Sequence, residues 1–211
     1  METLLPLIAL AIVGFVLYKF YRKWAVSKRE KLIDSFRFPA SVTQKIAEQY
    51  PHLTEQQAAE VIRGLREYFH LCNIAGKRMV SMPSQVVDVA WHEFILFTRK
   101  YEHFCSKALG RFLHHTPAEA MSSPTLAQKG IKTAWKISCG RENILPKSPS
   151  KLPLLFAIDA KLKIPDGFNY RLNCNNPGND AYCAGHIGCS SGCGGSSCSG
   201  DSGCSGGCGG D

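Results

Sequence analysis

The fold of this chain is decided by the stretch Ser84–His115, which reads SQVVDVAWHEFILFTRKYEHFCSKALGRFLHH. Apolar residues leave almost no polar stripe in its first half, and a helix of that kind is buried on most sides. The same stretch carries the side chains best suited to chemistry, namely Asp88, His92, Glu93, Tyr101, Cys105, His114 and His115. We therefore expect the core and any functional site to coincide here.

Within this stretch the pattern predicts helix. The β-branched residues after Ser84 would also suit a buried strand, but the length of the run and the charged residues that follow favour a helix. Arg99–Leu109 continues or restarts the helix after Thr98. Gly110 is typical of the residue that ends a helix in a left-handed conformation.

Two helices are predicted upstream. Pro39–Tyr50 has helical spacing of apolar residues and ends before Pro51, as helices do. Thr54 and Gln57 form a capping box at the start of an amphipathic helix that ends near Gly76. A linker is expected from Lys77 to Pro83.

Downstream, Pro124–Cys139 again shows helical spacing of apolar residues. Four later prolines exclude long helices beyond it: Pro146, Pro149, Pro153 and Pro165. The apolar segment Leu152–Tyr170 is expected to close over the helical core, with a short helix or strand before a turn at Pro165.

The N-terminus predicts a membrane anchor. Leu4–Tyr18 is uninterrupted apolar sequence, and Phe20, Tyr21 and Trp24 follow it as interfacial aromatic residues. A cleaved signal peptide is disfavoured because Glu2 is the only charged residue before the run and no small-residue cleavage site follows. A buried core helix would normally show a polar face. We expect residues 4–24 to lie in the lipid bilayer.

The formal net charge of +8 is concentrated directly after this apolar run. Such a position is typical of a segment held near anionic lipid headgroups, here around Lys19–Lys31, and no nucleic-acid partner is expected. The positive-inside rule then places the N-terminus outside and the rest in the cytoplasm, as in a single-pass protein of the inner cell membrane. The basic residues are Lys19, Arg22, Lys23, Lys28, Arg29, Lys31 and Arg37.

A metal site is a second hypothesis for the central stretch. Asp88 and His92 are four residues apart and share a helix face, so the carboxylate can orient the imidazole as a second-shell partner does. With Cys105 and His114 or His115, His92 would give a cluster suited to zinc or another transition metal. The alternatives are ordinary core histidines, a buried structural thiol, or a nucleophilic Cys105.

The central stretch also resembles the motif of the glycine-rich domain-containing proteins, a family of plants and bacteria, here of a bacterial membrane-anchored type. The matching residues are Asp88, Trp91, His92, Tyr101, Cys105, Gly110 and His114 or His115, and a looser match runs from about Pro39 to Tyr170. The resemblance implies a largely helical domain and no established reaction. Phe94 stands where the family motif has a second histidine, which removes a possible ligand.

The C-terminal tail consists largely of Gly, Ser and Cys and cannot bury a core, which predicts disorder. Its many thiols could alternatively hold zinc or copper(I) loosely, and disulfides are disfavoured in the cytoplasm. The cysteines are Cys174, Cys183, Cys189, Cys193, Cys198, Cys204 and Cys208.

With 211 residues and 45% hydrophobic content, the chain suits one domain with appendages. We predict a mainly α-helical protein with an anchor at 1–24, a basic juxtamembrane linker at 25–38, a helical bundle at 39–172 and a disordered tail at 173–211. No catalytic set is complete, so the favoured function is a membrane-held cytoplasmic binding or scaffolding module with an unknown protein partner. The alternative is a metal-binding protein or metal-dependent enzyme.

Overall fold

The computed structural model describes residues 4–115, 124–172, 182, 183 and 187, with side chains from Ile8 onward except those of 124–127, 182 and 183. The described chain is mainly helical, as predicted. The predicted disorder of the tail concerns residues outside this description, apart from the short strand β2 and Ile187. The elements are α1 (Leu4–Ser35), α2 (Ala40–Gln49), α3 (Glu55–Ala75), α4 (Gln85–Leu96), α5 (Thr98–Phe104), the π-helix η1 (Cys105–Leu109), α6 (Pro124–Arg141), α7 (Leu154–Lys161), β1 (Tyr170–Arg171) and β2 (Tyr182–Cys183).

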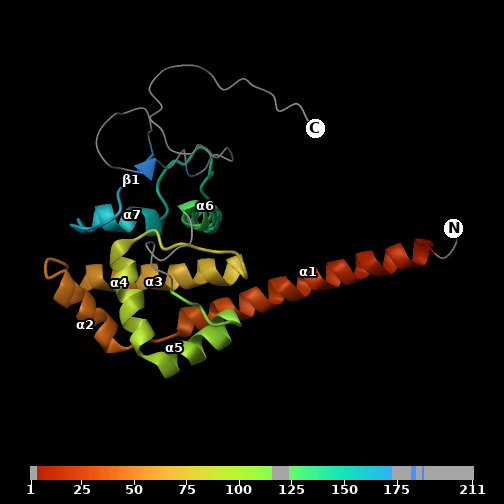
Figure 1. Ribbon diagram of the computed structural model, residues 1–211, viewed down its shortest axis with the longest axis horizontal. Coiled ribbons are helices and arrows are strands. Elements are labelled where there is room, and N and C mark those ends of the chain that lie inside the picture. The colour runs from red at the N-terminus through yellow and green to blue at the C-terminus, as the bar shows by residue number, and fades with distance from the viewer. Residues whose placement is uncertain (1–3, 116–123, 173–181, 184–186, 188–211) are drawn as a thin grey trace, which may run out of the picture.

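Helix α3 lies at the centre of the domain (Figure 1). It contacts α1, α2, α4 and η1 as well as α6 and α7, so most of its surface is covered. In Figure 1, α6 and α7 lie above it and α2 and α5 lie below it. The short strands β1 and β2 pair in parallel, Tyr170 opposite Tyr182.

The helix ends follow the signals in the sequence. The hydroxyl of Thr54 accepts a hydrogen bond from the Gln57 amide at 3.3 Å, and the Gln57 side chain accepts one from the Thr54 amide at 2.9 Å, which is the predicted capping box. Ser84 caps α4 through the Val87 amide. Gly110 adopts φ = 69° at the end of η1, a left-handed conformation that glycine reaches without steric cost.

The segment around α7 is tied to the start of α4 by one buried carboxylate. Asp159 accepts hydrogen bonds from the hydroxyl of Ser84 at 2.7 Å, from the amides of Gln85 and Val86, and from the amide of Phe168 at 2.9 Å. Burial raises the pKa of Asp159, while the hydrogen bonds act in the opposite direction. The carboxylate thus satisfies donors at a buried helix N-terminus.

An aromatic cluster forms the centre of the core. Phe104 packs against Phe36 with ring centroids 4.6 Å apart and against Phe69 at 4.7 Å, while Phe38 and Phe94 meet edge to face at 5.2 Å. Phe94 is fully buried within it. The residue that departs from the family motif therefore faces the core, whereas His92 lies on the exposed side of the same helix.

Helix α1 is a single element that leaves the domain (Figure 1). Residues 25–35, which the sequence analysis assigned to a linker, continue this helix and pack on the domain, where Ile33 is fully buried. The guanidinium of Arg66 donates to the carbonyl oxygens of Ile33, Asp34 and Phe36. Arg66 of α3 therefore supplies donors to carbonyl oxygens at the C-terminal end of α1, where intrahelical amide donors run out.

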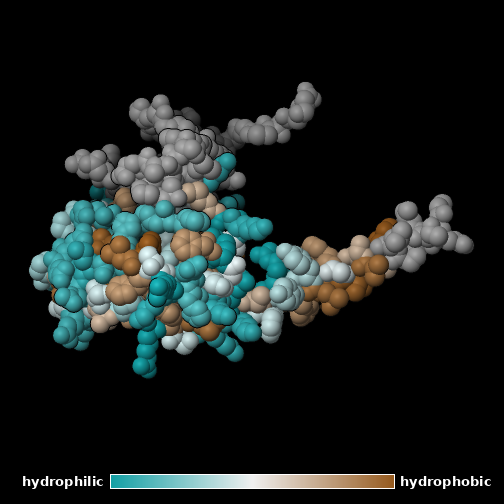
Figure 2. Space-filling model, turned by 60° about the horizontal axis from the view of Figure 1, so that its bottom comes forward, coloured by the Kyte–Doolittle hydropathy of each residue, from teal (hydrophilic) through white to brown (hydrophobic). Residues whose placement is uncertain are grey.

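The N-terminal part of α1 is apolar and uncovered. Side chains on all sides of the helix are exposed, up to 70% for Leu10 and 72% for Phe20. Figure 2 shows this part as a hydrophobic rod that stands clear of a largely hydrophilic domain. Within the described residues, no helix has both the length and the apolar character required to cross a membrane.

Candidate metal site

Three side chains with metal-ligating atoms converge at the end of the central stretch. Asp88 and His92 lie one turn apart on α4, and His115 comes from the segment that follows η1. Nε2 of His115 lies 2.9 Å from Nε2 of His92 and 3.1 Å from Oδ1 of Asp88. Nε2 of His92 lies 3.7 Å from Oδ2, the other oxygen of the Asp88 carboxylate, so the three side chains form a triangle.

The cluster is open on one side. The side chains of Asp88 and His115 are only 20% and 15% exposed, whereas that of His92 is 52% exposed. Two of the three side chains are therefore held by the protein surface around them, and the third borders on solvent. Such an arrangement leaves room for water or another small ligand beside the three side chains.

The carboxylate of Asp88 and the imidazoles of His92 and His115 bring lone pairs close together, and too few N–H groups are available for each close contact to be a hydrogen bond. A neutral imidazole carries one N–H, so Nε2 of His115 can donate to His92 or to Asp88 but not to both. If that nitrogen carries no proton, its lone pair faces the carboxylate oxygen at 3.1 Å. A cation at the centre of the triangle removes this conflict because all three atoms can coordinate it.

The position of His115 depends on two aromatic residues of the core. The indole N–H of Trp91 donates to the hydroxyl of Tyr101 at 3.1 Å, and that hydroxyl donates to the carbonyl of Leu113 at 2.5 Å. The ring of His115 then packs against Trp91, with centroids 4.6 Å apart. Trp91 and Tyr101 thus hold the segment that presents the third converging side chain.

Cys105 and His114, both predicted as ligands, do not belong to this group of converging side chains. Cys105 is fully buried beside Tyr101 and the backbone of Leu113, and burial raises the pKa of its thiol. A buried protonated thiol is a poor ligand and a poor nucleophile. His114 is exposed and its ring packs against Phe112 at 4.8 Å.

Asp88 was predicted to orient His92, but its carboxylate lies nearer to His115, at 3.1 Å, than to His92, at 3.7 Å, and is itself one of the three converging groups. The positioning roles of Trp91 and Tyr101 were not foreseen, although both lie in the motif. The only signal for them was their polar atom in an otherwise apolar core, since buried indole and phenol groups need a hydrogen-bond partner.

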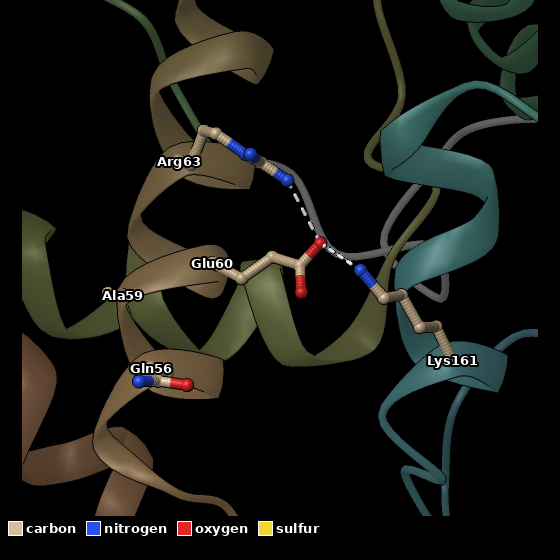
Figure 3. Close-up of a pocket in the computed structure, with 5 residues that line it drawn as sticks. All are labelled: Gln56, Ala59, Glu60, Arg63 and Lys161. Atoms are coloured by element: carbon tan, nitrogen blue, oxygen red, sulfur yellow. Dashed lines mark hydrogen bonds and ion pairs between the residues drawn. The ribbon is translucent and has the colours of Figure 1, made fainter.

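A separate depression of about 380 Å³ lies between α3 and α7. It is lined by Gln56, Ala59, Glu60, Arg63 and Lys161 (Figure 3). The carboxylate of Glu60 accepts from Arg63 at 2.9 Å and from Lys161 at 2.6 Å, so the charges in this depression are already paired with one another. The depression is shallow and open, and we assign no function to it.

Comparison with known proteins places the chain in one family. A family model described as UCP032817-like matches residues 28–189. No curated protein and no solved structure matches the chain. The resemblance to glycine-rich domain-containing proteins stays a prediction. Since the family model covers well over half of the sequence, including α2 to α7 and all three converging side chains, the chain belongs to the UCP032817-like family.

Proposed function

We propose that the protein binds a divalent transition-metal ion through Asp88, His92 and His115. The observation that carries this proposal is the mutual approach of one carboxylate and two imidazole nitrogens within 4.8 Å. Zinc–nitrogen bonds of about 2.0–2.1 Å place two ligand atoms roughly 3.3 Å apart in a tetrahedral site and about 2.9 Å apart in an octahedral one. The separations of 2.9 and 3.1 Å from Nε2 of His115 fall within this span, and the 3.7 Å between Nε2 of His92 and the second oxygen of Asp88 is somewhat longer.

The donor set also limits which metals fit. Two imidazoles and one carboxylate suit zinc, iron(II) and related ions, and this combination leaves coordination positions free for water. Calcium and magnesium prefer all-oxygen sites, so we expect weak binding of either. An open position would allow a small ligand to reach the metal, which is the feature that separates catalytic from structural zinc sites.

Metal titration of the purified full-length chain with Zn²⁺ and Co²⁺ tests this proposal. His92→Ala and His115→Ala should each remove one equivalent of bound metal. His114→Ala is the matched control, because this neighbouring histidine is exposed and lies outside the cluster. The tail cysteines are the same in all variants, so any metal they hold cancels. Equal metal content in His114→Ala and His115→Ala would contradict the proposal.

We also propose that α1 holds the domain at a membrane, as the sequence predicts. Its support is the exposure of apolar side chains on every side of the N-terminal part of α1, a surface that water does not favour. The apolar run Leu4–Tyr18 counts fifteen residues, of which those from Ile8 on have described side chains. On this proposal the metal site belongs to a cytoplasmic domain, where a protein partner can also bind.

Fractionation of cells that express the full chain tests the anchor. The protein should sediment with membranes, resist extraction at alkaline pH and require detergent for release. Replacement of Ile12 and Val16 by aspartate should move the protein to the soluble fraction, because charged side chains are costly within a bilayer. Wild-type protein recovered without detergent would rule the anchor out while leaving the metal proposal intact.

A further inference from the structure

Several contacts fix the C-terminal part of α1 against the domain. The side chain of Asn73 donates to the carbonyl of Val26 at 3.1 Å, and His70 lies 2.8 Å from the carboxylate of Asp34. Arg141 of α6 binds Glu30 at 3.2 Å. These contacts lie along α1 from Val26 to Asp34, so the direction in which α1 leaves the domain is set by the fold.

The loop after α3 lies where α1 leaves the domain. A Cβ atom placed on Gly76 would lie 3.9 Å from the guanidinium of Arg22. Figure 1 shows the C-terminal end of α3 at the edge of the domain that faces the free part of α1. The next three residues, Lys77, Arg78 and Met79, are all exposed, Met79 to 37%.

Helix geometry places this loop at the depth of lipid headgroups if α1 enters a bilayer. Each residue of an α-helix advances 1.5 Å, so Arg22 lies about 6 Å beyond Tyr18, the last residue of the apolar run. The headgroup layer on each side of a bilayer is roughly 5 to 8 Å deep. Arg22, and the loop beside it, therefore fall within or at the outer limit of that layer.

We propose that the loop Lys77–Met79 is a second lipid contact, which binds anionic headgroups around the base of the anchor. Lys77 and Arg78 supply positive charge directly after Gly76, which lies beside Arg22, and Met79 supplies an apolar side chain that can enter the interface. Basic residues near an anionic surface each strengthen binding by about fivefold. This inference rests on the proposed membrane anchor and adds that the domain lies against the bilayer in one orientation.

Acetylation of lysines in the full chain, reconstituted in vesicles, tests the inference. Vesicles of phosphatidylcholine with phosphatidylglycerol are compared with phosphatidylcholine alone and with detergent micelles. The acetylation rate of Lys19 reports whether α1 inserts, and that of Lys77 reports whether the loop contacts lipid. The exposed Lys45 on α2 is the control, because α2 lies on the side of the domain away from the free part of α1 (Figure 1). We expect Lys77 to react at least about fivefold more slowly in anionic vesicles, with Lys45 unchanged.

The outcomes separate the two proposals. Protected Lys19 with unprotected Lys77 overturns the loop contact and leaves the anchor. Unprotected Lys19 overturns the anchor and the loop contact together. Equal protection of Lys77 in neutral and anionic vesicles overturns recognition of anionic headgroups. Hydrogen exchange of the backbone amides provides a second test. Lys77→Glu should abolish the protection that anionic vesicles give to residues 77–80, whereas Lys45→Glu should preserve it. Loss of this protection in both variants, or in neither, also overturns the inference.

Discussion

The hydroxyl of Tyr101 donates a hydrogen bond of 2.5 Å to the carbonyl of Leu113, two residues before His115. The contact joins α5 to the segment that carries the third converging side chain. No ligand atom takes part in it, yet it sets where His115 can lie. Groups that orient metal ligands in this way affect affinity nearly as strongly as the ligands themselves.

Tyr101→Phe should therefore weaken metal binding by about tenfold or more while all three ligands remain. The measurement is the affinity for Co²⁺ or Zn²⁺ in the full-length variant. Tyr50→Phe is the control, because it also removes a hydroxyl that hydrogen-bonds to another element, here Asp166, away from the cluster. Equal affinities in the two variants would show that Leu113 is held without the Tyr101 hydroxyl.

Arg66 should matter for stability far more than Arg63, three residues earlier on α3. Arg66 binds three carbonyl oxygens at the end of α1, and its pKa is lowered by burial. Arg66→Ala should lower the free energy of unfolding by about 1.5–3 kcal/mol, the range for hydrogen bonds to a charged group, since two partly buried carbonyl oxygens and one exposed one lose their donor. Denaturant unfolding in detergent gives this value.

Arg63→Ala is the matched control for that experiment. The side chain of Arg63 is 64% exposed and pairs only with Glu60 in the described structure. Exposed pairs of this kind contribute between zero and about 1 kcal/mol. A similar loss of stability in both variants would contradict the capping role of Arg66.

Replacement by alanine should destabilise the protein at Gly64 and stabilise it at Gly140. A Cβ on Gly64 would lie 2.9 Å from Val87 and 3.4 Å from Ile158, where α3 meets α4 and α7. Gly64→Ala should cost about 1–3 kcal/mol through overpacking. Gly140 in α6 has open space at this position, so Gly140→Ala should stabilise the protein by about 0.5–1 kcal/mol. Thermal unfolding of both variants gives the sign, and stabilisation by Gly64→Ala would show that α3 can shift away from α4.

The core thiols should resist alkylation in the native protein. Burial raises the pKa of Cys72 to about 12 and that of Cys139 to about 11. At pH 8 roughly one Cys72 thiol in ten thousand and one Cys139 thiol in a thousand is then ionised, against about one in four for an ordinary thiol. Mass spectrometry after iodoacetamide treatment should find both unmodified until denaturant is added.

The same two thiols predict a loss of stability at alkaline pH. Their folded pKa lies above the unfolded value, so the unfolded chain releases protons first as pH rises. The contribution of these two thiols to the free energy of unfolding is therefore fully present below about pH 8.5 and is lost between pH 8.5 and pH 12. Serine at both positions should flatten this part of the stability curve. If the stability of the double variant falls at alkaline pH as steeply as that of the wild type, other groups cause the loss of stability.

Much of the local structure follows from the sequence because its causes are local. The capping box at Thr54, the serine cap at Ser84 and the left-handed Gly110 depend on neighbours within four residues. Asp88 and His92 share a face for the same reason, since 3.6 residues per turn bring positions four apart together. Spacing alone therefore predicted the relation between two of the three side chains of the candidate site.

Long-range contacts decided the remainder. Whether His114 or His115 meets α4 depends on the Tyr101–Leu113 hydrogen bond and the Trp91 ring, which bring distant segments together. Cys105 faces the core because η1 packs against α1 and α3.

In α1, too, one part follows from the sequence and another from long-range contacts. Its apolar N-terminal run was evident in the sequence. That residues 25–35 form a docked helix follows from Arg66, Asn73 and Arg141, which lie far along the chain and satisfy its polar groups. Sequence spacing fixes which residues share a helix face, but which of two adjacent residues is buried depends on partners that only folding brings into contact.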